Sequence, residues 1–139
     1  ESNEGTFCLA MIETQEAFDN LDDIASTPGL DGLYIGTADL TIGLNQGKLT
    51  PGFDRTEPEM IESKKKILDI AHKHGKVACL HCGTPEYAAK ASEWGFDLVT
   101  ITNDVRLLSG AAATHVRKFK ELTNQNYDES DKDNNPSSY

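Results

Sequence analysis

Gly32–Leu40 reads GLYIGTADL: a short apolar run, a glycine, and then a turn that contains an acidic residue. An apolar run of this length that leads directly into a loop is typical of a strand buried on both faces of a parallel sheet. A similar stretch lies upstream, where Thr6–Ile12 (TFCLAMI) is followed at once by Glu13. Both stretches predict strands with a carboxylate at or just beyond the carboxyl end.

Working outward, the order of apolar run, loop and amphipathic run repeats along the chain. The expected strands are Thr6–Ile12, Gly32–Ile35, Lys76–His81 and Leu98–Thr102. The expected helices run from Thr14 to Pro28, Glu59 to His74, Thr84 to Gly95 and Asp104 to Leu122, with a glycine-, asparagine- and proline-rich connection from Gly36 to Pro58. Strict alternation of strand and helix implies parallel strands with right-handed crossovers. The predicted fold class is α/β, built from consecutive βα units.

The length and the composition of the two ends set the expected extent of the domain. A complete (β/α)8 barrel needs roughly 200–250 residues, whereas the chain has 139. After Leu122 the apolar periodicity stops, and Asn124–Tyr139 (NQNYDESDKDNNPSSY) is almost wholly polar. We therefore expect a domain over residues 1–122 and a polar C-terminal tail over residues 123–139.

Charge and cysteine content limit the class of partner. The formal net charge is −10, which argues against a protein that binds nucleic acid through its phosphates. No apolar run approaches the length of a membrane span, and no signal peptide is visible. Three cysteines are too few for a disulfide scaffold. A cytoplasmic protein is the expectation, with secretion after processing as the alternative because the first residue is Glu1 rather than Met.

Glu13 and Asp39 are the candidate functional residues that the strand pattern picks out. Adjacent parallel strands lie about 4.8 Å apart, so their carboxyl ends would bring the two carboxylates to one rim. Oxygen ligands with open positions for water and substrate suit Mg²⁺, Mn²⁺ or Co²⁺. On spacing alone, helix caps and solvated loop residues are the commoner explanation for acids at strand ends.

An ordered set of motifs resembles the HpcH/HpaI aldolase family, which contains the 4-hydroxy-2-oxoheptanedioate aldolases. The motifs are Met11–Thr14, Asn20–Ile24, Pro28–Gly36 and Ala38–Leu40, with weaker similarity continuing to about Leu122. The resemblance implies the C-terminal half of a TIM barrel, four βα units long. It also implies a class II aldolase that cleaves 4-hydroxy-2-oxo acids to pyruvate and an aldehyde with a divalent metal ion.

The resemblance assigns roles to a few residues of this chain. Glu13 and Asp39 match the family's metal ligands, and Gly36, Thr37 and Ala38 match the loop whose backbone amides hold the substrate carboxylate. The sequence departs from the family where Thr37 replaces a frequent proline and Met11 replaces a frequent glutamine. The family's catalytic His–Asp pair and its pyruvate-binding arginine belong to the first half of the barrel, so the catalytic residues are unknown here. We expect the isolated chain to be inactive, and a truncated or secreted non-enzymatic binding protein or antigen is the alternative.

Three further features have competing explanations. The spacing of Cys79 and Cys82 is that of some zinc and redox sites, but the strand pattern sends the two side chains to opposite faces. His81 ends a strand at the functional rim and either lines the pocket or is a satisfied rim histidine. Lys64–Lys66 is predicted to be a solvated helix face.

Assembly is the last expectation. Half a barrel leaves two bare strand edges and an inner face that the complete barrel would bury. Candidate residues for that inner face are Met11, Leu33, Ile35, Cys79 and Ile101. We therefore expect a homodimer or a higher oligomer, with the last helix, Asp104–Leu122, and the C-terminal tail contributing to the interface.

Overall fold

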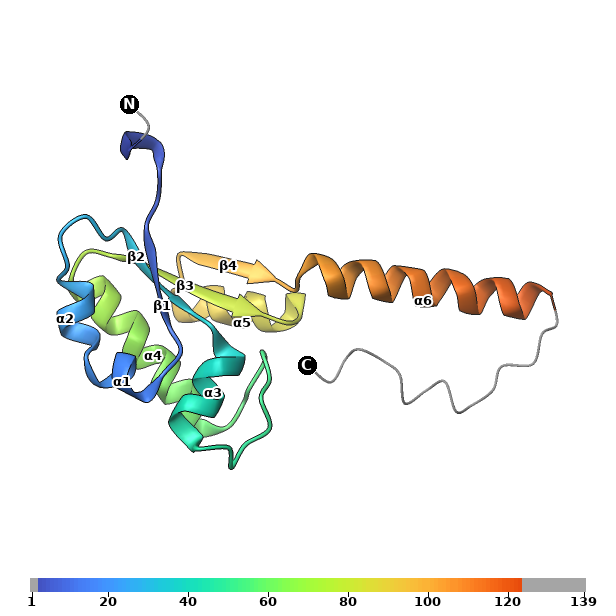
Figure 1. Cartoon of the computed structure of the whole chain (residues 1–139), viewed down its shortest axis with the longest axis horizontal. Coiled ribbons are helices and arrows are strands. Elements are labelled where there is room, and N and C mark those ends of the chain that lie inside the picture. The colour runs from blue at the N-terminus through green and yellow to red at the C-terminus, as the bar shows by residue number, and fades with distance from the viewer. Residues whose placement is uncertain (1–2, 124–139) are drawn as a thin grey trace. The chain divides into compact units, whose positions relative to one another are not determined.

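The computed structural model describes residues 3–123 (Figure 1). The chain divides into two compact units, one that ends at Ile101 and one that begins at Thr102. The first unit contains all the strands, and the second contains one long helix. Among residues 3–123, none of the helices combines the length and the apolar character that a membrane span requires.

The strands of the first unit form a single parallel sheet, as the alternating pattern predicts. The sheet contains β1 (Leu9–Ile12), β2 (Gly32–Ile35), β3 (Val77–Cys82) and β4 (Leu98–Ile101), in that spatial order. Each strand pairs in parallel with the next in the chain, so Met11 lies beside Tyr34, and Tyr34 lies beside Cys79. β1 begins later than expected and is preceded by a 3-10 turn, η1 (Asn3–Gly5). The predicted α/β class with four βα units is correct.

Threonine side chains cap the helices that directly follow β1 and β3. In place of the single helix expected after β1, the structure has two short helices, α1 (Gln15–Asp19) and α2 (Leu21–Ala25), which are separated at Asn20. α4 (Pro58–Lys73) and α5 (Pro85–Trp94) follow β2 and β3. The hydroxyl of Thr84 accepts a hydrogen bond from the backbone N–H of Tyr87 at 3.3 Å, which makes it the predicted N-cap of α5. Gly95 ends α5 in the left-handed region with φ 106°.

α3 (Thr37–Asn45) corrects the expected loop after β2. Its sequence, TADLTIGLN, contains glycine and several β-branched residues, which are weak helix formers. Burial compensates for the low helix propensity, because Leu40 and Thr41 are buried within the first unit. Gly43 allows the close approach: a Cβ at this position would lie 2.7 Å from the backbone oxygen of Glu13. The helix ends at Gln46, which adopts a left-handed conformation.

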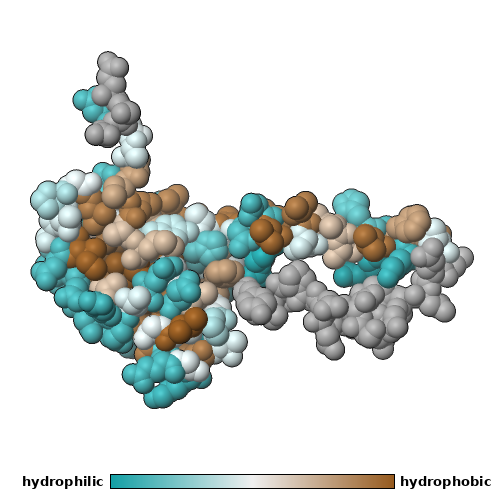
Figure 2. All heavy atoms as spheres, in the orientation of Figure 1, coloured by the Kyte–Doolittle hydropathy of each residue, from teal (hydrophilic) through white to brown (hydrophobic). Residues whose placement is uncertain are grey.

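The helices of the first unit share a core with one face of the sheet. The buried side chains that form this core include Ile12, Leu33, Ile35, Leu80, Cys82, Leu21, Met60, Ile67 and Ala91. The expectation that Leu33 and Ile35 face a barrel interior is therefore wrong, because both belong to this helix-side core. Met11 alternates with Ile12 and points to the opposite face, where 56% of its surface is exposed. Figure 2 shows hydrophobic surface over the strands of the first unit.

Lys64 contradicts the expected solvated face of three lysines. It is fully buried in α4, and its ammonium donates to the hydroxyl of Tyr87 at 2.7 Å and to the carbonyl of Arg55 at 3.4 Å. The Tyr87 hydroxyl also donates to the Arg55 carbonyl, at 2.6 Å. Burial lowers the pKa of Lys64 to about 8 and raises the pKa of Tyr87. Lys65 and Lys66 are exposed, as expected.

The second unit contains α6 (Asp104–Leu122), which ends where the expected domain ends. Asn103 caps it through its side-chain oxygen, which accepts from the backbone N–H of Arg106 at 2.9 Å. None of its residues is buried, and Figure 2 shows hydrophobic side chains along it. The expected tail over residues 123–139 lies, apart from Thr123, outside the described residues.

Candidate functional site

Glu13 lies at the carboxyl end of β1 and folds back over the end of β2. A Cβ added to Gly36 would overlap the carboxylate of Glu13, so the carboxylate rests directly on the glycine backbone. Only glycine leaves this space. Glu13 is half-buried, and the sheet therefore holds its carboxylate at the rim, as the sequence pattern predicts.

Gly36, Thr37, Ala38 and Asp39 form the N-terminus of α3. Gly36 is the N-cap, and the other three residues occupy the first turn. The backbone N–H groups of a first turn have no partner within the helix and favour anions. Gly36 and Thr37 are buried, Ala38 is half-buried and Asp39 is exposed. The turn therefore combines an anion-binding backbone with one accessible carboxylate beside Glu13.

The two carboxylates influence each other. Burial raises the pKa of Glu13, and the negative charge of Asp39 raises it further. Two acids in this arrangement repel each other, and a cation between them would relieve the repulsion. Hard oxygen donors of this kind fit a divalent metal such as Mg²⁺ or Mn²⁺. No set of three or more metal-binding side chains occurs within residues 3–123, so the fit rests on two protein ligands.

A polar cluster lies beside this rim on the sheet face that carries Met11. It consists of Tyr34 from β2, His81 from β3 and Thr100 from β4. The Nδ1 atom of His81 lies 2.7 Å from the Thr100 hydroxyl and 3.2 Å from the Tyr34 hydroxyl, and the two hydroxyl oxygens are 2.9 Å apart. All three residues are half-buried. The sequence pointed to His81 alone, because its partners become visible only once the strand register is known.

The rim and the cluster are joined by contacts on either side of His81. The Thr37 hydroxyl donates to the backbone carbonyl of His81 at 3.1 Å. The ring of Phe53 meets the imidazole edge to face, with centroids 4.6 Å apart. Phe53 is followed by Asp54, whose carboxylate accepts from the Gly83 N–H and the Thr84 hydroxyl, each at 2.7 Å. The segment between α3 and α4 is thus attached to the end of β3.

The two strand cysteines do not form a zinc or redox pair. Both are buried free thiols, and Cys82 belongs to the helix-side core whereas Cys79 does not. Burial raises the pKa of Cys79, and raises the pKa of Cys82 to about 11. Protonated buried thiols are poor nucleophiles and poor metal ligands. The two cysteines are therefore packing residues.

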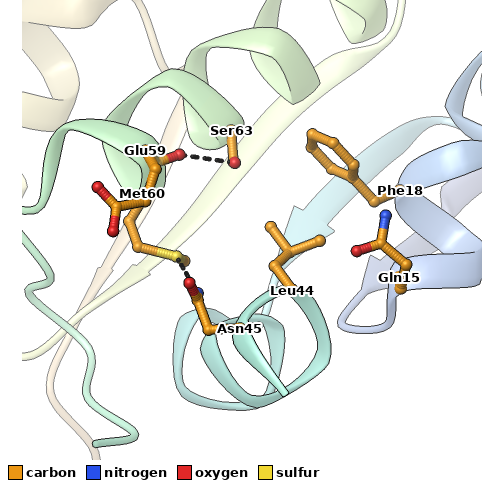
Figure 3. A pocket seen from close by; sticks show the side chains of 7 residues that line it. All are labelled: Gln15, Phe18, Leu44, Asn45, Glu59, Met60 and Ser63. Atoms are coloured by element: carbon orange, nitrogen blue, oxygen red, sulfur yellow. Dashed lines mark hydrogen bonds between the residues drawn. The ribbon is translucent and has the colours of Figure 1, made fainter. Parts of the chain in front are cut away.

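A shallow pocket of about 200 Å³ lies between α1, α3 and α4 (Figure 3). Its lining residues are Gln15, Phe18, Leu44, Asn45, Glu59, Met60 and Ser63. Several of their polar groups are already used within the protein. Asn45 donates to the sulfur of Met60 at 3.1 Å, and the Ser63 hydroxyl donates to the Glu59 carbonyl at 2.7 Å. Glu13 and Asp39 do not line this pocket.

Comparison with known proteins gives consistent matches. The family model described as HpcH/HpaI aldolase/citrate lyase matches residues 1–109. A hydroxypyruvate/pyruvate aldolase of Rhizorhabdus wittichii is 38% identical over 122 residues, which are 88% of this chain and 47% of that protein. A 5-keto-4-deoxy-D-glucarate aldolase of Escherichia coli is 30% identical over 87% of this chain and 45% of that protein.

Solved structures agree with the sequence matches. The HpcH/HpaI aldolase of Desulfitobacterium hafniense superimposes with a TM-score of 0.75 at 26% identity, over 90% of this chain and 47% of that one. A citrate synthase, SbnG, superimposes with a TM-score of 0.67 at 30% identity, over 86% of this chain and 48% of that one. The chain spans about half the length of the relatives it matches.

Proposed function

The chain belongs to the HpcH/HpaI aldolase/citrate lyase family, and we propose that it is the metal-binding half of a divalent-metal-dependent aldolase. The reaction is retro-aldol cleavage of a 4-hydroxy-2-oxo acid to pyruvate and an aldehyde. One observation carries the proposal: the carboxylate of Glu13 lies on Gly36, beside Asp39 in the first turn of α3. Carboxylates that can bind a cation and backbone amides that can bind an anion thus lie together at the carboxyl ends of β1 and β2.

Glu13 and Asp39 are the proposed ligands of Mg²⁺, Mn²⁺ or Co²⁺. Two carboxylates leave most coordination positions to water and to the oxygens of a 2-oxo acid. Such an ion, when bound, supplies Lewis-acid stabilisation of negative charge on the substrate. The protein's part is to hold the two carboxylates in place, which the Gly36 backbone and the close contact at Gly43 support.

Gly36, Thr37 and Ala38 are the proposed binding loop for the substrate carboxylate. Gly36 is the N-cap, and Thr37 and Ala38 belong to the first turn, of a nine-residue helix whose N-terminus favours negative charge. The side chain of Thr37 is turned away from this role, because its hydroxyl donates to the His81 carbonyl. Backbone amides alone would therefore bind the carboxylate, and pyruvate or another 2-oxo acid is the proposed ligand.

Turnover by this chain alone is proposed to be negligible. The chain covers about half of its relatives, and the base and the arginine that the resemblance implies lie in the part of the barrel before Glu13. An assay of pyruvate release from a 4-hydroxy-2-oxo acid with Mn²⁺ is the measurement. Turnover at the rate of a complete aldolase would contradict this part of the proposal.

Binding of a 2-oxo acid is the experiment that tests the site. The Mn²⁺-loaded chain should bind pyruvate, and removal of Mn²⁺ should abolish the binding. Asp39→Asn should weaken it at least tenfold, whereas the exposed control Glu62→Gln should not change it. If pyruvate binds equally to wild type and to Asp39→Asn, the rim is not the site. If neither wild type nor Asp39→Asn binds pyruvate, a non-enzymatic binding protein that keeps the fold becomes the better explanation.

A further inference from the structure

Thr37 is a polar residue whose side chain is fully buried at the start of α3. Its hydroxyl donates to the backbone carbonyl of His81 at 3.1 Å, although α3 follows β2 and His81 belongs to β3. The strand register explains this contact: Ile35, the last residue of β2, is paired with Leu80, so β2 ends one residue short of His81. The Thr37 side chain therefore extends the connection between the two strands beyond the end of their ladder.

Gly36 cannot fix the orientation of this turn through a side chain. The carboxylate of Glu13 occupies the space that a Cβ at position 36 would need, so the N-cap of α3 has to be glycine. Glycine has the greatest backbone freedom of all residues and offers no side-chain oxygen that could cap the first turn. The first side chain that can hold the turn against the sheet is therefore that of Thr37.

Threonine is suited to this task because of its shape and its hydroxyl. A β-branched side chain has few rotamers, and the buried position of Thr37 restricts it further. The Cα of Thr37 joins the peptide group that carries its own N–H to the peptide group that carries the N–H of Ala38. A side chain held by the His81 carbonyl therefore limits the directions in which both N–H groups point.

Thr41 provides a contrast within the same helix. It is also fully buried, and its hydroxyl donates to the carbonyl of Thr37 at 2.7 Å. That bond runs between successive turns of α3 and does not hold the helix to the sheet. Each of the two buried threonines thus contributes a hydrogen bond, but the bond of Thr37, unlike that of Thr41, joins the first turn of α3 to β3.

We propose that Thr37 is a positioning residue: the bond from its hydroxyl to the His81 carbonyl holds the N–H groups of Thr37 and Ala38 in the orientation that binds the carboxylate of a 2-oxo acid. The inference rests on the proposed function, which assigns the carboxylate to this turn. The Thr37 side chain acts through the backbone and does not touch the ligand. Without the bond, the turn adopts further orientations, and the affinity falls with the fraction of molecules in which it is correctly oriented.

Removal of the hydroxyl at constant side-chain shape is the test. Pyruvate is titrated calorimetrically into wild type and Thr37→Val, each saturated with Mn²⁺. Thr37→Val should bind pyruvate roughly fivefold more weakly, because one buried hydrogen bond no longer favours the competent orientation. Thr37→Ser keeps the hydroxyl, and its affinity should stay within about twofold of wild type. Thr37→Ala is a second variant without the hydroxyl, and its affinity should match that of Thr37→Val.

Thr41→Val separates positioning from general stabilisation. It removes an equally buried hydroxyl of α3, so its melting temperature should fall as that of Thr37→Val does, but its affinity for pyruvate should equal that of wild type. An unchanged affinity in Thr37→Val and Thr37→Ala would overturn the positioning role. So would an equal loss of affinity in Thr41→Val, or a loss in Thr37→Ser as large as that in Thr37→Val, and each of these results leaves the rim site intact. Failure of Mn²⁺-loaded wild type to bind pyruvate would instead overturn the proposed function, and the positioning role with it.

Discussion

The carboxylate of Glu13 lies against the Cα of Gly36, so closely that any side chain at position 36 would occupy the same space. The two residues directly follow the neighbouring strands β1 and β2, and their contact limits where one proposed metal ligand can point. Gly36 also caps α3, which carries Asp39. One glycine therefore contacts one of the two proposed ligands and begins the helix that carries the other.

Gly36→Ala should displace Glu13 and weaken metal binding. The added Cβ overlaps the carboxylate, which must move away from Gly36 to make room. We expect the affinity for Mn²⁺ to fall at least tenfold, which is about 1.4 kcal/mol, with the circular dichroism spectrum unchanged. Gly110→Ala in α6 is the matched control, because nothing lies within 4 Å of a Cβ there. Equal Mn²⁺ affinities for wild type and Gly36→Ala would show that Glu13 is not a ligand.

Thr102 is a β-branched residue with φ 59°, a left-handed conformation that such side chains rarely adopt. The strain costs about 1–3 kcal/mol, and glycine would relieve most of it. After subtracting the extra entropy of an unfolded glycine, Thr102→Gly should stabilise the chain by about 1 kcal/mol. The melting temperature should rise by about 4 °C. Thr123→Gly is the control: Thr123 has φ −97°, so glycine there should lower the melting temperature. A lower melting temperature for Thr102→Gly than for wild type would show that Thr102 is not strained.

Much of the fold could be predicted from the sequence because the deciding signals are local. Apolar runs gave the strands, and Thr84 and Gly95 gave the ends of α5. The burial of Lys64 could also have been predicted, because Lys64 lies four residues after Met60 and three before Ile67, on the apolar stripe of α4. The run of three lysines suggested instead that all three are exposed. A helix turns about 100° per residue, however, so it cannot expose three consecutive side chains equally.

The rest depends on contacts between distant residues. α3 forms from weak helix formers because burial of Leu40 and Thr41 outweighs their propensity. Tyr34 and Thr100 have polar atoms 2.9 Å apart but are 66 residues apart in sequence. Only the register of three parallel strands brings them to His81. The placement of Glu13 was predictable as a strand-end acid, whereas its contact with Gly36 was not.

Lys64 should make stability depend on pH. Its pKa falls to about 8 in the folded protein from an ordinary value of 10.5, because of burial. Between these values the unfolded chain binds the proton and the folded chain does not, so raising the pH favours folding. Relative to Lys64→Met, wild type should gain roughly 2 kcal/mol between pH 7 and pH 9.5.

Denaturant unfolding of both proteins at a fixed concentration measures this gain. Taking the difference is necessary because Cys82 and Tyr87 also face Lys64 and titrate at high pH, and Asp54, Glu57 and Arg55 act on its charge. All of these groups are present in Lys64→Met. A difference between the two proteins that stays constant from pH 7 to pH 9.5 would show that Lys64 has an ordinary pKa.

Assembly is the last prediction, and exposed apolar surface is its basis. In the first unit, Met11 and Leu98 are 56% and 44% exposed, and β1 and β4 each have one unpaired edge within the described sheet. In the second unit, α6 carries exposed apolar residues that include Val105, Leu108, Val116, Phe119 and Leu122. Soluble monomers rarely leave large apolar patches in water, and unpaired strand edges invite pairing with another chain.

We propose that a second copy of the chain covers part of this surface, giving a homodimer or a higher oligomer. Leu108 and Phe119 lie eleven residues apart, about three helical turns, and so share one face of α6. Leu108→Glu with Phe119→Glu should therefore favour the monomer by placing charges on that face. Lys118→Gln with Lys120→Gln is the charge-matched control, because each pair of substitutions lowers the net charge by two. Multi-angle light scattering at micromolar concentration should give at least twice the 15.2 kDa of one chain for wild type. A monomeric wild type with one cooperative melting transition would contradict the proposal, since the exposed faces would then be stable in water by themselves.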